Sequence, residues 1–167
     1  TLVTALQQFK DDYDRNHPLW RIIPEFCRAH PRYERMGLRD LSQSIHEMYA
    51  KNNIARLTTE MYLSDLKPAL KPWDAFSRIA HRKTERVKID ELEGRISTTL
   101  LTPYPPGIPL LIPGEVFNKK IVQYLRFARK FNTQFPGFDT DVHGLVMGEE
   151  GDGYCVDCVA RGAEEAS

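Results

Sequence analysis

Apolar residues recur at helical spacing through the first half of the chain, as in Leu2, Val3, Leu6 and Phe9. Prolines divide this half into short pieces, because the residue before a proline avoids the helical region. Between two of them, Trp20, Ile23 and Phe26 are the expected apolar anchors. The expected helices span residues 2–9, 18–30 (as one or two pieces), 38–49, 54–66 and 73–80. The pattern therefore predicts a first half that is helical throughout.

The second half has a different pattern, which begins near Thr84. Alternating or β-branched residues predict strands there, and Asn118 is a candidate N-cap for the longest helix, which ends at Pro136-Gly137. The expected strands span 85–89 (edge-like), 96–101, 110–112, 141–147 and 154–159, with a hairpin at 149–153 between the last two. The order predicts an α+β fold: a helical N-terminal half, then a small mixed or antiparallel sheet packed on one long helix.

Composition narrows the functional classes. With 41% hydrophobic and 28% charged residues the chain is typical of soluble globular proteins. Its formal net charge is zero, which gives no indication of a nucleic-acid or membrane partner. Apolar runs fall short of the roughly 20 residues that span a bilayer. Three cysteines provide no disulfide framework, so we expect a reducing, cytoplasmic location.

The stretch 102–115, TPYPPGIPLLIPGE, is apolar and stiff, since it holds five of the eleven prolines. Proline fixes φ and removes a backbone donor, so this segment is predicted to be neither a helix nor a central strand. We expect Leu110, Leu111 and Ile112 to be buried. A rigid segment of this kind is suited to holding Tyr104 and Glu115 in fixed places.

This stretch, followed by QFPGFDTDVHG at 134–144, resembles the C-terminal domain of the bacterial lysine/arginine/ornithine decarboxylases. The resemblance runs from about Leu38 to Ala160. It implies pyridoxal-phosphate (PLP) enzymes of the aspartate-aminotransferase fold type, of which this chain would be one domain. The expected division is a helical connecting segment at 1–37, the decarboxylase C-terminal domain at 38–160 and a disordered tail at 161–167. Because the chain begins at Thr1 with a helical pattern, we expect a piece of a longer protein.

The resemblance also implies where the chemistry lies. In the family the PLP lysine directly follows a histidine, and no His-Lys pair occurs here. The expected catalytic residues and cofactor therefore belong to other domains, and this chain alone is expected to be inactive. The expected partners are the remaining domains of the subunit, a neighbouring subunit in a homodimer or higher oligomer, and a basic amino-acid substrate.

Tyr104 and Glu115 are the candidate substrate-channel residues. The Tyr104 ring could simply pack with its hydroxyl bonded to backbone, but a rigidly held polar group also suits a binding site. The resemblance favours the site, because in this family the domain helps to form the mouth of the active-site channel. Glu115 could provide favourable charge near a helix N-terminus, or a carboxylate aimed at a cationic substrate.

Two further groups of residues could have either a chemical or a structural role. Asp141 and His143 could form an acid–base pair or a hydrogen-bonded turn beside a strand, and the structural role is favoured. Cys155 and Cys158 form a CxxC, but residues i and i+3 of a strand point to opposite faces. Only Cys27 and scattered histidines remain as further ligands, so no metal site is predicted.

Three functional hypotheses remain at this point. The first is the C-terminal domain of a PLP-dependent basic amino-acid decarboxylase, with lysine as the first-choice substrate and arginine or ornithine next. The second is a non-catalytic interaction module that recruits a protein through the strand edge at 85–89. The third is a redox or zinc protein built on the CxxC.

Overall fold

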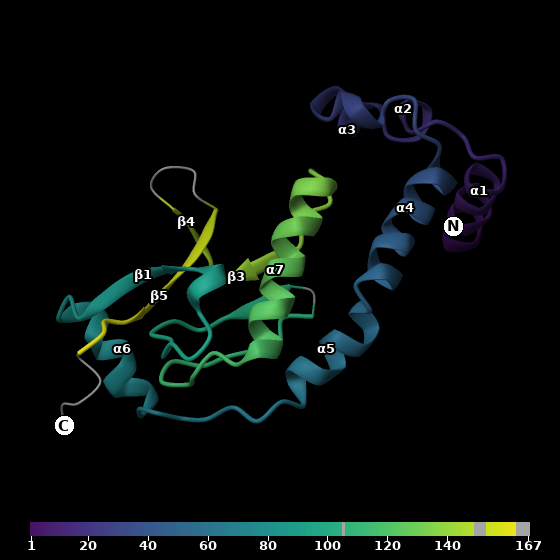
Figure 1. Cartoon of the computed structure of the whole chain (residues 1–167). Helices are drawn as coiled ribbons and strands as arrows, with labels where there is room; N and C mark the ends of the chain where they lie inside the picture. Colours follow the sequence, from purple (N-terminus) through teal and green to yellow (C-terminus); the bar gives the residue numbers. More distant parts are fainter. Residues whose placement is uncertain (105, 149–152, 163–167) are drawn as a thin grey trace. The chain divides into compact units, whose positions relative to one another are not determined.

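The computed structural model describes residues 1–104, 106–148 and 153–162 and divides into two compact units, drawn in Figure 1. Unit 1 is Thr1–Ala55 and unit 2 is Arg56–Ser167. Most of the expected hairpin at 149–153, and the tail beyond residue 162, lie outside the described residues.

Unit 1 is made of short helices that follow one another in the chain. Proline residues start α3 and η1, which explains why the predicted segment 18–30 forms two helices. The bounds are α1 (Leu2–Asp14), α2 (Leu19–Ile22), α3 (Pro24–Ala29), η1 (Pro31–Tyr33) and α4 (Leu38–Lys51). The helical first half of the chain is therefore confirmed.

The predicted anchors of this segment were wrong in two cases. Trp20 and Ile23 are exposed, and the buried positions are instead Leu19, Cys27 and Tyr33. The reason is the break at Ile23, whose φ of −134° and ψ of 65° lie outside the helical region. Because α2 and α3 are separate helices, residues spaced by three across the break do not lie on one helical face.

Asn16 joins the end of α1 to the start of α4. Its backbone has φ of 52°, and its Oδ1 accepts hydrogen bonds from the amides of Arg39 (3.0 Å) and Asp40 (3.3 Å). These amides belong to the first turn of α4, where backbone N–H groups have no hydrogen-bond partner within the helix. A Cβ added at Gly37 would lie 2.0 Å from Asn16 Oδ1, so a glycine is required for this close approach.

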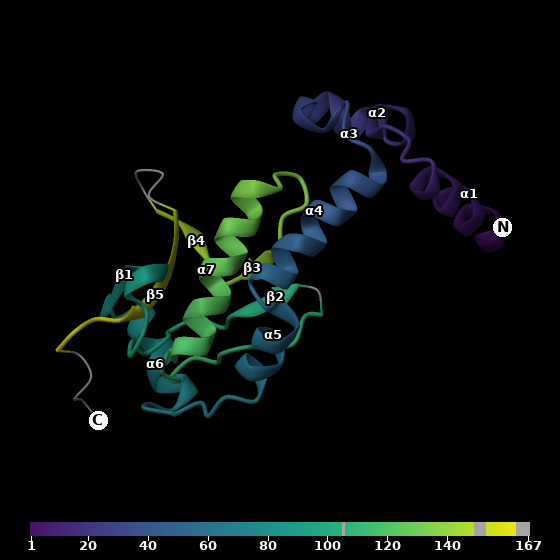
Figure 2. The ribbon, with the colours of Figure 1, turned by 45° about the vertical axis from the view of Figure 1, so that its right-hand side comes forward.

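Unit 2 contains two small antiparallel sheets, which confirms the α+β class. One sheet has the order β1-β5-β4 and the other pairs β2 with β3, as Figure 2 shows. The strands are β1 (Thr84–Lys88), β2 (Thr102–Tyr104), β3 (Asp141–His143), β4 (Val146–Met147) and β5 (Tyr154–Val159). The helices are α5 (Ile54–Tyr62), which begins at the unit boundary, α6 (Pro72–Ala80), η2 (Ile89–Glu91) and α7 (Lys119–Gln134). β1 is an edge strand, as predicted.

The long helix α7 is the centre of the unit 2 core. Its N-cap is Asn118, whose side chain accepts a hydrogen bond from the amide of Ile121 at 3.0 Å, as predicted. On the outer face of α7, Arg126 and Arg129 both bind the carboxylate of Asp90 on η2. The predicted inward positions are all buried: Ile121, Tyr124, Leu125, Ala128 and Phe131. None of the described helices is both long and apolar enough to cross a bilayer.

The predicted strands at 96–101 and 110–112 do not form. Residues 96–101 make only isolated bridges, because Thr98 uses both its amide (3.1 Å) and its hydroxyl (2.7 Å) to bind the carbonyl of Asp157. The Ser97 hydroxyl binds back to the carbonyl of Thr99. The hydroxyl side chains thus make individual bonds, one local from Ser97 and one to a distant carbonyl from Thr98, in place of a continuous ladder. In the second segment, Leu110 and Leu111 are buried as expected, whereas Ile112 is exposed.

The predicted strand at 141–147 is interrupted at Gly144, and its halves join different sheets. β3 pairs with β2, while β4 pairs with β5. Gly144 has φ of +96°, and a Cβ there would lie 2.4 Å from the carbonyl oxygen of Leu100. The turn thus depends on glycine for both its conformation and its close approach to another backbone segment.

Candidate functional site

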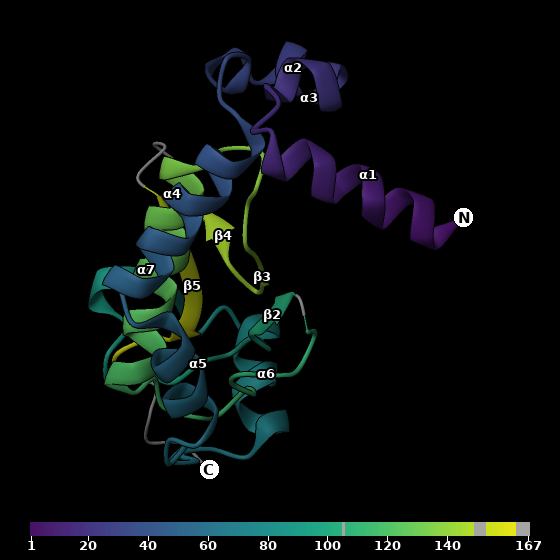
Figure 3. The same ribbon diagram turned by 90° about the vertical axis from the view of Figure 1, so that its right-hand side faces the viewer.

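The candidate site lies on the two-stranded sheet, where β2 and β3 lie side by side (Figure 3). Tyr104 is the Cα partner of Asp141, and Thr102 is the partner of His143. In each strand the middle residue, Pro103 or Val142, is buried. Because strand side chains alternate between faces, Tyr104, Asp141 and His143 share the outer face.

The Tyr104 ring is held at a defined place on this face. It lies edge-on to the His143 ring, with centroids 6.4 Å apart and planes at 86°. The next turn closes through a 2.9 Å hydrogen bond from the amide of Gly107 to the carbonyl of Pro103. Gly107 has φ of +80°, and a Cβ there would be 3.4 Å from Tyr104 Cδ2. Tyr104 is nevertheless 59% exposed, so more than half of the residue is open to solvent or to a partner.

The base of the proline-rich stretch is fixed by the core. Leu101 donates from its amide to the carbonyl of Leu111 at 2.9 Å, and Leu110 donates to the carbonyl of Leu101 at 2.8 Å. All three leucines are at most 2% exposed. The loop between them is therefore held at both ends by buried residues, as its composition predicted.

Asp141 and His143 form a pair beside Tyr104. His143 Nε2 lies 3.3 Å from Asp141 Oδ2, and both side chains are about two-thirds exposed. The sheet therefore brings together three of the four predicted site residues. As a group they present a phenol, a carboxylate and an imidazole, which can hydrogen-bond an ammonium or other polar group. The closeness of Asp141 to His143 follows from the sequence, but the place of Tyr104 beside them does not, because the pairing of β2 with β3 joins segments about forty residues apart.

Glu115, the fourth predicted site residue, makes its hydrogen bonds within its own turn. Its Oε2 accepts a hydrogen bond from the amide of Ile112 at 2.8 Å, and its own amide donates to the carbonyl of Ile112 at 3.2 Å. The preceding Gly114 has φ of +92°, and a Cβ there would lie 2.3 Å from the carbonyl oxygen of Leu70. The carboxylate thus closes its own turn, and a role toward substrate stays a prediction.

The CxxC cysteines lie on the central strand β5. Both are buried and free, and burial raises the pKa of the Cys158 thiol to about 12. A thiol with so high a pKa is a poor nucleophile and a poor metal ligand at neutral pH. The burial of both cysteines and the raised pKa of Cys158 agree with the interpretation of Cys155 and Cys158 as ordinary strand cysteines.

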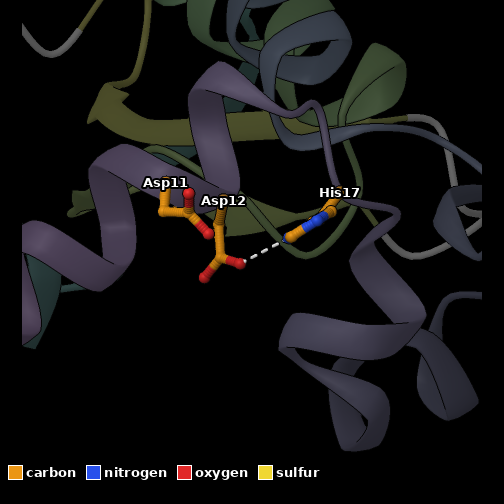
Figure 4. Close-up of side chains that lie close together, drawn as sticks. All are labelled: Asp11, Asp12 and His17. Atoms are coloured by element: carbon orange, nitrogen blue, oxygen red, sulfur yellow. Dashed lines mark hydrogen bonds and ion pairs between the residues drawn. The ribbon is translucent and has the colours of Figure 1, made fainter.

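A cluster that the sequence analysis did not single out occurs in unit 1. Asp11, Asp12 and His17 form the group of possible metal ligands found among the described residues, shown in Figure 4. His17 Nδ1 lies 2.8 Å from Asp12 Oδ1, Gln8 donates to the same carboxylate, and Arg15 pairs with Asp11 at 2.8 Å. The His17 hydrogen bond, assisted by that of Gln8, lowers the pKa of Asp12. These bonds occupy both oxygens of Asp12 and one oxygen of Asp11, and they fasten the end of α1.

Comparison with known proteins identifies the family. A family model described as the C-terminal domain of Orn/Lys/Arg decarboxylases matches residues 55–160. The chain belongs to this family. Lysine decarboxylase LdcA of Pseudomonas aeruginosa is 45% identical over 165 residues, covering 95% of this chain and 22% of that protein. The biodegradative arginine decarboxylase of Escherichia coli K12 is 37% identical over 151 residues, covering 88% of this chain and 20% of that protein.

Solved structures of decarboxylases have the same fold. Lysine decarboxylase A from P. aeruginosa superposes with a TM-score of 0.87 at 44% identity, over 95% of this chain and 22% of that chain. The constitutive lysine decarboxylase of E. coli gives a TM-score of 0.86 at 31% identity, over 95% of this chain and 23% of that chain. The predicted family is confirmed, and the chain spans about a fifth of the length of the relatives that it matches.

Proposed function

We propose that this domain is part of a PLP-dependent basic amino-acid decarboxylase, in which it helps to shape the entrance to the active site and the contacts between subunits. Lysine is the first-choice substrate, because the lysine decarboxylase LdcA is 45% identical to the chain. Arginine and ornithine are next, since the family model includes both. We further propose that the enzyme is oligomeric and cytoplasmic; three free cysteines are in keeping with the cytoplasmic location.

The exposed ring of Tyr104 carries the proposal. A tyrosine that served only the domain's own packing would be expected in the core, whereas this one is 59% exposed on a stretch fixed by buried leucines. Its neighbours Asp141 and His143 are also exposed. A carboxylate and a phenol on one rigid face suit the passage of an amino acid with a cationic side chain.

The described residues do not fit the cofactor. PLP enzymes hold the cofactor through a lysine in a pocket, and it then acts as the electron sink for decarboxylation. Eight of the nine lysines of this chain are exposed, and Lys120 is half-buried in an ion pair with Glu60. We therefore assign PLP to the other domains of the parent enzyme.

Kinetics of the full-length enzyme test the channel role. We expect Tyr104→Phe to lower kcat/KM for lysine about tenfold through loss of one hydrogen bond to the passing substrate, which corresponds to about 1.4 kcal/mol. We expect a smaller decrease for Glu115→Gln. The matched controls Tyr49→Phe and Glu93→Gln alter an exposed phenol and an exposed carboxylate elsewhere. Parallel assays on arginine and ornithine identify the preferred substrate.

The result depends on intact assembly, which size-exclusion chromatography checks for each variant. Unchanged kinetics for both Tyr104→Phe and Glu115→Gln would remove the channel role. A decrease shared by the controls would show a general effect on the fold.

An interaction module remains the second candidate, because β1 is an edge strand of its sheet. Its unpaired side is available for strand addition by a partner. Arg86→Pro removes a backbone donor from this edge, so a binding function predicts that the variant fails to capture a protein that the unmodified domain captures.

A further inference from the structure

Helix α6 has its apolar side exposed. Trp73 is 75% exposed, Phe76 55% and Ile79 40%, and these residues are spaced by three, on one face of the helix. The face of α6 that is buried carries Ala75 and Arg78 instead. We name Trp73, Phe76 and Ile79 the α6 stripe; α6 lies at the periphery of unit 2 in Figure 1.

This orientation is the reverse of that expected for a surface helix, which buries its apolar face and exposes its charged residues. Arginine is mostly exposed in proteins, yet Arg78 is only 7% exposed. The remaining exposed positions of α6 are Pro72 and Ala80, which add no charge. The exposed residues of α6 are therefore all uncharged and apolar, with Asp74 and Ser77 half-buried beside them. An exposed apolar face of this kind is typical of a surface that another protein segment covers.

The size of the stripe indicates what kind of partner covers it. Two aromatic rings and an isoleucine, partly exposed, present on the order of 300 Å². A stable complex between separate molecules buries about 800 Å² on each partner. A segment of the same polypeptide can be held by a smaller patch, because the covalent connection already provides a high effective concentration. The relatives continue for nearly four-fifths of their length beyond the part that matches this chain.

We propose that the α6 stripe is the docking surface for an apolar, uncharged segment of the same subunit, in the domains of the parent enzyme that lie outside this chain. This inference rests on the proposed membership of a longer enzyme and names the surface of unit 2 that joins it. It does not depend on the substrate, on Tyr104 or on PLP. Docking through α6 fixes the orientation of unit 2, and with it the direction in which β2 and β3 face.

Photocrosslinking in the full-length enzyme tests the proposal. Trp73 is replaced by the photoreactive amino acid p-benzoyl-phenylalanine, and the enzyme is assembled from equal amounts of ¹⁵N-labelled and unlabelled subunits. Mass spectrometry then identifies the crosslinked peptide and whether both halves carry the same isotope. The matched control places the same probe at Leu63, which is 79% exposed and lies outside the stripe.

We expect the probe at position 73 to crosslink efficiently to one apolar peptide outside residues 1–167, with the same isotope in both halves. Mixed isotopes would assign the stripe to a neighbouring subunit and overturn the proposal. A crosslink within residues 1–167, or a yield no higher than that of the Leu63 control to scattered peptides, would overturn it as well.

A second variant checks the energetic consequence. Trp73→Glu places a charge on the stripe without disturbing the core of unit 2, since the side chain is exposed there. We expect hydroxyl-radical labelling of Phe76 in the full-length enzyme to rise at least threefold, whereas Leu63→Glu leaves it unchanged. Equal labelling of Phe76 in all three proteins would contradict the docking. Lysine decarboxylation is measured separately, so failure of the channel role and failure of the docking are distinguishable.

Discussion

The two units of the chain are built on different principles. Unit 2 forms its core from segments far apart in sequence, since Val87, Leu101, Leu125, Val142 and Val156 share one buried cluster. Unit 1 packs short helices that follow one another, and a hydrogen-bonded asparagine joins α1 to α4. The family model begins at residue 55, and the compact division falls after Ala55. The family model therefore matches the part of the chain with the long-range core, and we propose that residues 1–37 are a helical connecting segment.

The largest expected effect comes from the core of unit 2. Leu125→Ala removes a fully buried side chain from the middle of α7, and we expect it to lower the free energy of unfolding by about 3 to 4 kcal/mol. The matched change in unit 1 is Leu41→Ala, at a site that is 4% exposed. We expect it to cost about 2 kcal/mol, because a small set of short helices relaxes around the gap. Peptide-resolved hydrogen exchange of the 167-residue chain in urea measures each unit separately.

Each of these substitutions should lower hydrogen-exchange protection mainly in the unit that contains it. If Leu125→Ala lowers protection equally in α4, or Leu41→Ala in α7, the two units unfold as one and the comparison fails.

Glycine substitutions should give the next largest difference. Gly144→Ala combines a φ of +96° with a backbone oxygen at 2.4 Å, and backbone cannot move aside, so we expect a loss of about 2 to 3 kcal/mol in unit 2. In unit 1, the nearest atoms to a Cβ added by Gly37→Ala belong to the Asn16 side chain, which can turn away. Doing so costs the bonds from Asn16 to α4, about 1 to 2 kcal/mol. Denaturant midpoints for each unit provide the measurement.

Gly94→Ala is the control, since Gly94 also has positive φ (+81°) but nothing lies within 4 Å of an added Cβ. It should cost about 1 kcal/mol. A loss for Gly144→Ala no larger than that for Gly94→Ala would show that the approach to Leu100 is not required.

The contrast between local patterns and long-range contacts explains which features could be predicted from the sequence. The inward face of α7, its Asn118 cap and the edge strand β1 follow from local patterns, and the structure confirms all three. The two motifs at 102–115 and 134–144 together were sufficient to recognise the family. In unit 1, Pro24 correctly marked a break, but the break shifted the helical phase, so the exposure of Trp20 was missed.

The failures in unit 2 have a different physical source, which is contact between distant segments. The split at Gly144 depends on the carbonyl of Leu100, and the loss of a strand at 96–101 depends on bonds from Thr98 to Asp157. The grouping of Tyr104 with His143 depends on the β2–β3 pairing. A single sequence shows residue types and local spacing, but it gives no direct measure of which distant backbones meet.

The smallest expected effect is a response to acid that differs between the units. In unit 1 the hydrogen bond from His17, with that from Gln8, holds the pKa of Asp12 below its usual 3.8. In unit 2 Arg129, and after it Arg126, lower the pKa of Asp90. Because each folded-state pKa lies below the unfolded value, the unfolded state binds more protons in this range. The stabilisation is present above about pH 4 and is lost as the pH falls through the folded-state pKa.

Asp12→Asn should therefore flatten the decrease in protection of unit 1 between pH 5 and pH 2.5 and leave that of unit 2 unchanged. Asp90→Asn should do the reverse, with the smaller change, because its carboxylate is half exposed and water and salt screen its ion pairs. Hydrogen exchange at matched denaturant, corrected for the intrinsic pH dependence of exchange, measures both. If either variant flattened the response of both units together, acid would act on the chain as a whole and the distinction between the two units would not extend to their electrostatics.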